Sequence, residues 1–212
     1  MDDSTNSFAH HLAAAQFIND ANKDFFRGNK LYDKAITLPF KPAQVRGNVL
    51  RHGCWLTRDN CCCNYFYGNG AHQNWNPNPY PSWLVVLQTH LEKICNIKPG
   101  FVNSCFVNWY ESGKQALHWH ADDEQLFYDE DDVPIISFTL DSNSRTFLLR
   151  DEESGEIFDV VLRNKDILFM FGRLQQFYKH SVARGDSSSD RINFTFRAIR
   201  QHVSCCPKAR TN

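Results

Sequence analysis

The chain has 212 residues, which is enough for one domain with a substantial hydrophobic core and short for two. Its 42% hydrophobic and 22% charged residues exclude collagen-like, coiled-coil and wholly disordered proteins. The net charge of −1 argues against a strongly basic nucleic-acid clamp, but this average conceals a segregation of charge. Seven acidic residues and no basic ones lie between Asp122 and Asp132, and the remainder of the chain has a formal charge of +6.

Neither a membrane span nor an export signal is expected. No apolar run approaches the roughly 18 residues of a spanning helix, and the polar start Met1 to Ser4 is unlike a secretory signal. We therefore expect an intracellular protein of the nucleus or cytoplasm, with its eight cysteines reduced. The run Cys61 to Cys63 with His72 has the wrong spacing for a zinc site, and such a site is not favoured.

The N-terminal part of the chain predicts helices separated by short strands and loops. An amphipathic helix is expected over 8–27, with Ser7 as its N-cap. Short strands and loops are expected over 31–81. A second helix is expected over 83–96 with Ser82 as its cap, because its apolar residues recur at intervals of three and four.

From Phe101 onward the pattern changes to β-strands separated by turn residues. The expected strands are 101–110, 116–122, 135–141, 145–150, 156–162, 166–171, 177–183 and 191–199. Eight short strands without intervening helices predict a double-sheet jelly roll or a related barrel. The fold class is therefore mainly β with flanking helices.

His120 and Asp122 form an H-x-D pair. On a strand, residues i and i+2 point to the same face, so both side chains can reach one metal ion. A third ligand such as His180 completes the two-histidine, one-carboxylate triad of non-haem Fe(II) oxygenases. Since one H-x-D pair arises readily by chance, the assignment depends on the rest of the chain.

Residues 191–197 alternate strictly, with Arg191, Asn193, Thr195 and Arg197 on one face and apolar residues on the other. Arginine binds carboxylates bidentately, so the polar face suits an acidic ligand inside a barrel. The two arginines lie about 20 Å apart at ~3.3 Å per residue, so they serve different groups or opposite ends of one ligand. An edge strand with solvent-facing arginines is equally compatible with the spacing.

The sequence R-x-N-x-T-x-R, following H-x-D and a distal histidine, resembles the AlkB family of Fe(II)- and 2-oxoglutarate-dependent nucleic-acid dealkylases. Further segments resemble the same family in the same order: Asn108-Trp109-Tyr110, His120 to Glu124, Pro134 to Phe138, Arg145 to Phe147 and Phe177 to Val182. Upstream, Arg51 to Trp55, Tyr65 to Tyr67 and Asn78-Pro79 resemble the family's substrate lid, placed at about 51–81. The resemblance divides the chain into an N-terminal helical extension (1–44), a dioxygenase domain (45–200) and a C-terminal tail (201–212).

The resemblance implies that His120, Asp122 and His180 bind Fe(II), with 2-oxoglutarate and O2 as co-substrates. It further implies a set of 2-oxoglutarate-binding residues: Asn108, Tyr110, Arg191, Asn193, Thr195 and Arg197. Arg191 is assigned to the distal carboxylate of the co-substrate. Arg197 is assigned either to its oxo-acid end or to orienting the metal site.

The implied activity is oxidative demethylation of 1-methyladenine or 3-methylcytosine in DNA or RNA, releasing formaldehyde, succinate and CO2. The base must leave the stack, so the partner is a single-stranded or flipped-out nucleic acid. The residues assigned to the base are Tyr67 and His120 on its two faces, Tyr65 or Trp55 as a supporting wall, Asp123 and Glu124 at its cationic edge, and Arg51 in the lid.

Two alternatives remain open, and we expect a monomer in each case. An oxygenase of the same fold acting on a protein or small molecule needs the same triad and arginines. A catalytically inactive nucleic-acid-binding module is less favoured, because every triad position is filled. In the main interpretation, Asp122 to Glu124 belong to the site and Asp129 to Asp132 form a solvated turn.

Overall fold

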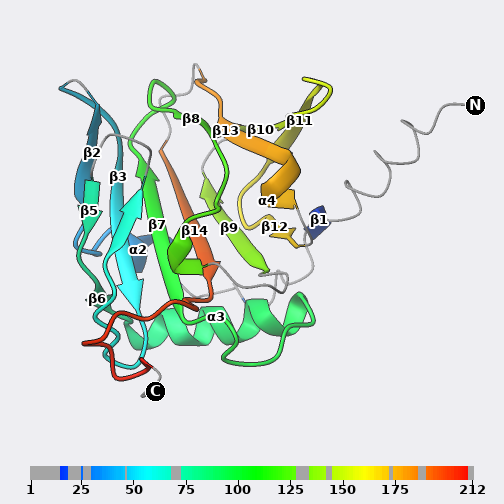
Figure 1. The fold of residues 1–212 in the computed structure, drawn as a ribbon. Coiled ribbons are helices and arrows are strands. Elements are labelled where there is room, and N and C mark those ends of the chain that lie inside the picture. The colour runs from blue at the N-terminus through cyan, green and yellow to red at the C-terminus, as the bar shows by residue number, and fades with distance from the viewer. Residues whose placement is uncertain are drawn as a thin grey trace, which may run out of the picture.

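The computed structural model describes residues 15–18, 25, 30–45, 47–67, 73–127, 134–141, 145–171, 174–185 and 190–209. A large and a small β-sheet face each other, and helix α3 (Ser82–Ile94) packs on the outer face of the large sheet (Figure 1). No helix in these described ranges has the length and apolar character that a membrane crossing requires.

The large sheet carries the candidate site on its inner face. Its strands run in the order β1 (Ala15–Ile18), β12 (Ile167–Met170), β9 (Ile135–Asp141), β14 (Arg191–Arg197), β7 (Ser104–Tyr110), β3 (Asn48–Thr57) and β2 (Lys41–Val45), with β6 (Asn78–Pro79) beside β3. The small sheet has the order β11 (Ile157–Leu162), β10 (Arg145–Asp151), β13 (Tyr178–Val182) and β8 (Leu117–His120). The remaining elements are the hairpin β4 (Tyr65–Tyr67) and β5 (Gln73–Trp75), and the short helices α2 (Leu31–Ala35), η1 (Gln125–Phe127) and α4 (Leu174–Phe177).

The predicted mainly β architecture is confirmed, and each of the eight expected strands is present within a few residues of its expected bounds. The helix expected over 83–96 is present as α3, one residue early: Ser82 is its first residue and Pro81 occupies the N-cap position. The strand expected over 177–183 is preceded by α4, and the strand expected over 116–122 ends at His120.

The helix predicted over 8–27 is wrong at residues 15–18. These residues form β1, which pairs antiparallel with β12 from Ala15 opposite Met170 to Ile18 opposite Ile167. An edge strand presents unpaired backbone groups, and pairing with them overrides a local helical pattern. The proposed cap Ser7 lies outside the described residues. The boundary between residues 44 and 45 stays a prediction; β1 lies before it and β2 runs across it, and both are strands of the large sheet.

Strand β14 lies between β9 and β7, so it is central rather than an edge strand. All seven of its residues are buried. Its apolar residues Ile192, Phe194 and Phe196 join the core beneath α3, and its polar residues face the space between the sheets. The interpretation of Arg191 and Arg197 as solvent-facing is therefore wrong, because a strand with both neighbours and both faces covered has no solvent side.

Helix α3 is fixed to the loop that follows it by the buried Glu92 carboxylate. This carboxylate accepts hydrogen bonds from the backbone N–H of Gly100 (2.9 Å) and of Val102 (3.1 Å), and from Gln88 Nε2 (3.1 Å). Charged groups are rarely fully buried without such partners. The contact holds the chain in place just before it enters β7.

The expectation that all eight cysteines are reduced is wrong for two of them. Cys62 and Cys205 form a disulfide between the loop after β3 and the C-terminal segment. The other six cysteines are free and buried. Residues 143 positions apart in the sequence are thereby linked, and this pairing left no local signal in the sequence.

Candidate metal and co-substrate site

A narrow cavity of about 30 Å³ lies between the inner faces of the two sheets. Its lining includes eleven residues that the sequence assigned to the site: Arg51, Tyr65, Asn108, Tyr110, His120, Asp122, His180, Arg191, Asn193, Thr195 and Arg197. These residues come from both sheets and from segments up to 146 positions apart in the numbering, so the fold gathers what the motifs left scattered.

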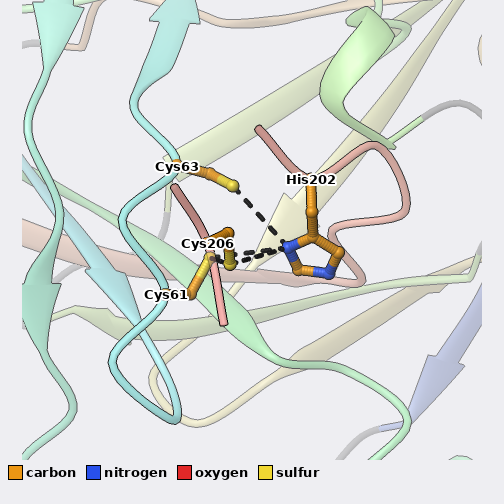
Figure 2. Close-up of side chains that lie close together, drawn as sticks. All are labelled: Cys61, Cys63, His202 and Cys206. Carbon is orange, nitrogen blue, oxygen red and sulfur yellow. Dashed lines mark hydrogen bonds between the residues drawn. The ribbon is translucent and has the colours of Figure 1, made fainter. Parts of the chain in front are cut away.

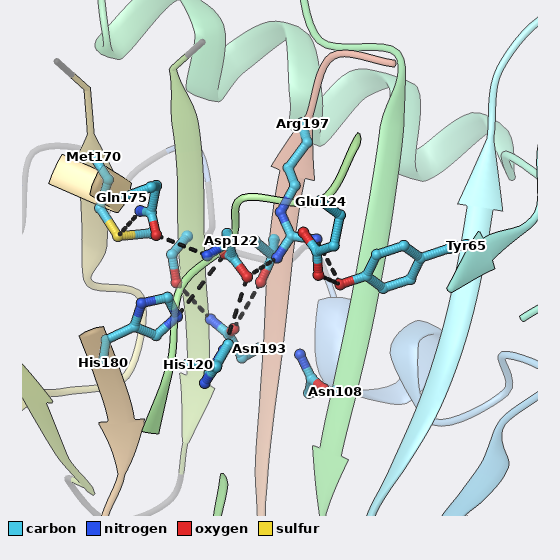
Figure 3. A network of polar contacts seen from close by, with 12 residues as sticks. Tyr65, Asn108, His120, Asp122, Glu124, Met170, Gln175, His180, Asn193 and Arg197 are labelled. Atoms are coloured by element: carbon cyan, nitrogen blue, oxygen red, sulfur yellow. Dashed lines mark hydrogen bonds and ion pairs between the residues drawn. The ribbon is translucent and has the colours of Figure 1, made fainter. Parts of the chain in front are cut away.

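His120, Asp122 and His180 form a compact cluster at this cavity (Figure 3). His120 Nε2 is 3.8 Å from Asp122 Oδ1, and His180 Nε2 is 3.9 Å from Asp122 Oδ2. The two histidines are register partners on β8 and β13, which explains why their ring centroids are only 4.1 Å apart. Asp122 lies just past the end of β8 and turns back toward them.

Both histidines are held in the neutral form that binds metals. Burial, and then the neighbouring His180, lower the pKa of His120 to about 3. Burial also lowers the pKa of His180. The His118 carbonyl accepts a 2.8 Å hydrogen bond from His120 Nδ1, which places the proton there and leaves the Nε2 lone pair directed at the cluster.

Asp122 is kept ionised by Arg197. Burial by itself would raise the pKa of the Asp122 carboxyl, but the positive charge of Arg197 and then the two histidines hold it below the usual value. Arg197 Nη2 lies 2.5 Å from Asp122 Oδ1, and both side chains are buried. The backbone N–H of Asp122 donates to Gln175 Oε1 at 2.9 Å, which fixes the loop that carries the carboxylate.

The donor set fits a divalent iron ion. One ligand atom from each of the three residues lies within 4.8 Å of the others. Two neutral imidazoles and one carboxylate, placed on one side of a cavity, are the ligand set of non-haem Fe(II) oxygenases, which leaves the opposite positions open. The cluster is therefore a chemically coherent iron site.

The opposite end of β14 carries a second buried arginine. Arg191 Nη2 donates to Thr139 Oγ1 at 3.2 Å, and its guanidinium lies 5.6 Å from the centre of the Tyr110 ring. Between the two arginines, Asn193 Nδ2 donates to Ser137 Oγ at 2.8 Å, and Thr195 Oγ1 donates to Asn193 Oδ1 at 3.2 Å. The strand thus presents a positive charge at each end and hydrogen-bonding groups between them.

A wider pocket of about 680 Å³ lies next to the triad and shares His120 and Arg51 with the narrow cavity. Its volume is within the range typical of small-molecule sites. The exposed Asp123 and the half-buried Glu124 are among the residues that line it. Arg51 is buried and donates from Nε to Asn108 Oδ1 at 2.6 Å, so it joins the wall of the wide pocket to the narrow cavity.

The aromatic residues assigned to the base are placed at different depths. Tyr65 is fully buried and donates its hydroxyl to Glu124 Oε1 at 2.6 Å, while Arg197 donates to the same hydroxyl at 3.2 Å. Trp55 lies behind it in the core, with its ring 5.0 Å from the Tyr65 ring. Tyr67 is part of β4, but its side chain lies outside the described residues, as do Asp129 to Asp132.

Glu124 faces inward rather than only toward the wide pocket. Burial raises the pKa of its carboxyl to about 7, although the charge of Arg197 opposes the shift. Its contacts with Tyr65 connect it to the same network as Asp122 (Figure 3). Asp123 is the acidic residue of this segment that is exposed at the pocket.

Some residues of the site were missed from the sequence. Ser137 and Thr139 are two residues apart on β9, so they point to the same face, where they accept hydrogen bonds from side chains of β14. The alternation of polar and apolar residues in 135–139 could have identified them. Gln175 binds the Asp122 backbone and also donates to Met170 Sδ at 3.6 Å. It lies on the four-residue helix α4, which is too short to produce a periodic signal.

Comparison with known proteins agrees with this geometry. The 2OG-Fe(II) oxygenase superfamily is matched over residues 10–197. Alpha-ketoglutarate-dependent dioxygenase alkB homolog 3 of Mus musculus is 31% identical over 131 residues, covering 57% of this chain and 45% of the relative. DNA oxidative demethylase ALKBH2 of Arabidopsis thaliana is 29% identical over 193 residues, covering 76% of this chain and 59% of the relative.

A solved structure, that of OsALKBH1, matches the fold with a TM-score of 0.60 and 18% sequence identity, covering 87% of this chain and 97% of the other. At this identity the match supports the jelly-roll fold and no more. The chain spans about half the length of the curated relatives it matches.

Proposed function

The chain belongs to the 2OG-Fe(II) oxygenase superfamily and is of the AlkB type, and on this premise we propose that it removes N-methyl groups from nucleic-acid bases by oxidation. The substrates proposed are bases of the 1-methyladenine and 3-methylcytosine type in single-stranded or flipped-out DNA or RNA. One observation carries the proposal: the His120, Asp122 and His180 cluster lies where a cavity lined by buried arginines meets a wider pocket lined in part by acidic residues.

In this proposal His120, Asp122 and His180 hold Fe(II). Iron, 2-oxoglutarate and O2 together supply the oxidation of the methyl carbon, with formaldehyde, succinate and CO2 as products. The residues of the chain prepare the ligand set: the His118 carbonyl fixes the tautomer of His120, and the Gln175 amide fixes the backbone of Asp122.

Arg191 binds the distal carboxylate of 2-oxoglutarate, with Asn108 and Tyr110 on the neighbouring strand. The register supports this grouping, because Arg191 is directly opposite Tyr110 and Asn193 is directly opposite Asn108. A guanidinium buried against an aromatic ring is a strong and specific carboxylate receptor. Arg197 lies at the metal end, where its contact with Asp122 favours orienting the metal site over binding the far carboxylate.

The methylated base enters the wide pocket. The exposed Asp123 carboxylate lies where a positively charged methylated base would be recognised, and His120 forms the floor of the pocket. A base inside a duplex cannot reach this depth, so an unpaired or flipped nucleotide is required. Tyr67 is proposed to cover the upper face of the base. We also propose that the protein acts as a monomer inside the cell, in the nucleus or cytoplasm.

The proposal is tested with matched oligonucleotides that carry one 1-methyladenine or 3-methylcytosine, as single-stranded DNA and as RNA. Incubation with Fe(II), 2-oxoglutarate and O2 is expected to return the unmodified base, detected by mass spectrometry, with release of formaldehyde. His180→Ala, which removes one ligand, is the control and is expected to be inactive. Succinate formation without demethylation of any of these oligonucleotides would contradict the proposal and favour a protein or small-molecule substrate.

A further inference from the structure

Four side chains converge at a place distant in sequence from the iron triad. Cys61 and Cys63 come from the loop after β3, and His202 and Cys206 come from the C-terminal segment after β14 (Figure 2). The three cysteines are buried and the histidine is partly buried. One ligand atom of each lies within 4.8 Å of the other three. We propose that these residues form a zinc-binding site that fastens the C-terminal segment to the loop before β4.

Two of the four distances match a tetrahedral metal site, and the other two are 0.2–0.3 Å shorter. Zinc bonds of about 2.3 Å to sulfur and about 2.0 Å to nitrogen place neighbouring ligand atoms about 3.5–3.8 Å apart. His202 Nδ1 is 3.7 Å from Cys61 Sγ, 3.6 Å from Cys63 Sγ and 3.2 Å from Cys206 Sγ. Cys61 Sγ and Cys206 Sγ are 3.3 Å apart. Small movements of the side chains bring all four atoms to bonding distance of one ion.

The donor set selects zinc among the divalent metals. Three buried sulfurs and one partly buried imidazole, without a carboxylate, make the Cys3His set of structural zinc sites. The backbone N–H of Val203 donates to Cys63 Sγ at 3.5 Å, and such a hydrogen bond stabilises a thiolate ligand. The His120, Asp122 and His180 cluster contains no sulfur, so the two sites differ in chemistry as well as in place.

A second disulfide is the competing use of these groups. Cys61 and Cys206 are close enough in space to be considered for one. Such a bond would leave Cys63 and His202 directed at the same point without a role. Cys62, between the two cluster cysteines, already pairs with Cys205. The convergence of all four groups therefore favours a metal ion.

The proposed zinc site connects the C-terminal segment to a segment that lines the catalytic cavity. Cys63 accepts a 2.9 Å hydrogen bond from Trp55 Nε1 at its carbonyl, and Tyr65, two residues further on, reaches Glu124 and Arg197. In Figure 1 the C-terminal segment, in red, lies against the cyan loop that follows β3. Zinc binding would thus hold in place the segment that carries Tyr65 into the cavity wall.

The test counts zinc in the full chain, purified without chelators from cells supplied with zinc. The Asp122→Ala variant serves as background, because it removes the triad as a second metal site. About one zinc per chain is expected there by plasma mass spectrometry. Adding Cys63→Ser or His202→Ala is expected to abolish the bound zinc. Adding Cys95→Ser, which changes a free, buried cysteine outside the cluster, is expected to leave it unchanged.

A second measurement avoids dependence on the folding of variants. In the chain with its cysteines intact, replacement of zinc by Co(II) is expected to give the thiolate-to-cobalt charge-transfer absorption of a tetrahedral sulfur-rich site. A mercurial reagent is expected to release about one zinc, detected with a metal indicator dye. A zinc-free chain whose peptide map shows Cys61 bonded to Cys206 would overturn the proposal. So would zinc that survives Cys63→Ser, or that Cys95→Ser removes equally.

Discussion

The ion pair between Arg197 and Asp122 gives a prediction that separates the metal-free from the metal-bound protein. Arg197→Met removes the guanidinium that lies 2.5 Å from the Asp122 carboxylate, where both side chains are buried. Removing one partner of a buried pair costs about 3–5 kcal/mol, because the other charge is left uncompensated. For a chain of this size the melting temperature is expected to fall by about 6–20 °C.

A bound divalent cation should recover part of this loss. Mn(II) in place of Fe(II) avoids oxidation and supplies the positive charge that Asp122 has lost. By linkage, the metal is expected to stabilise Arg197→Met more than the parent chain. The assay is urea unfolding of both proteins with and without Mn(II), in the absence of 2-oxoglutarate.

Arg191→Met is the matched control. Arg191 is equally buried on the same strand, but its assigned contacts are with Thr139 and Tyr110 at the other end. Its loss of stability should be the same with and without Mn(II). An unchanged stability deficit of Arg197→Met in Mn(II), or an equal reduction of the deficit of Arg191→Met, would refute this role of Arg197.

Three further predictions concern the co-substrate and the framework. Arg191→Ala is expected to raise the KM for 2-oxoglutarate at least tenfold, because about 1.5–3 kcal/mol of charged hydrogen bonding is lost. Oligonucleotide affinity, measured by fluorescence anisotropy, is expected to change little. Equal losses of affinity for 2-oxoglutarate and for the oligonucleotide would refute the assignment of Arg191. Gly53→Ala is expected to lower stability by about 1–3 kcal/mol in urea, because its new Cβ would lie 2.6 Å from ring atoms of Phe106 and of Trp75; an unchanged midpoint would show that these rings move freely. Glu92→Ala is expected to cost ~2 kcal/mol or more, since it removes the acceptor of the Gly100 and Val102 N–H groups; thermal unfolding within 1 °C of the parent would contradict this.

The strands were the most predictable part of the fold. Alternation of polar and apolar residues in 191–197 identified both faces of β14, and the structure places Phe194 in the core and Asn193 at the cavity. Periodicity of this kind is a local property, so a single sequence contains it. The H-x-D pair and the distal His180 could likewise be recognised as motifs in the sequence, and the structure brings them together.

The errors come from contacts between distant segments. Strand β1 forms because the edge of β12 is available to pair with it, and nothing near residues 15–18 in the sequence reveals that edge. Gln175 reaches Asp122 across 53 positions, from a helix of one turn. Tertiary contacts of this length override local propensity and cannot be inferred from spacing.

The cysteines show the same limit. In the sequence, Cys61 to Cys63 and the nearby His72 do not have the spacing of a zinc site. The structure instead places Cys61 and Cys63 beside His202 and Cys206, about 140 positions away. Zinc motifs are recognised in sequence when their ligands are close together, and a site assembled from two distant segments has no such signature.

The central claim, that the His120, Asp122 and His180 cluster drives demethylation of a base, is tested most directly by the ratio of products. Succinate and formaldehyde are measured in the same reaction with a methylated oligonucleotide and with its unmethylated counterpart. We expect equal amounts of the two products with the methylated strand, and little of either with the unmethylated strand. Succinate formed at the same rate with both strands, without formaldehyde, would contradict the claim.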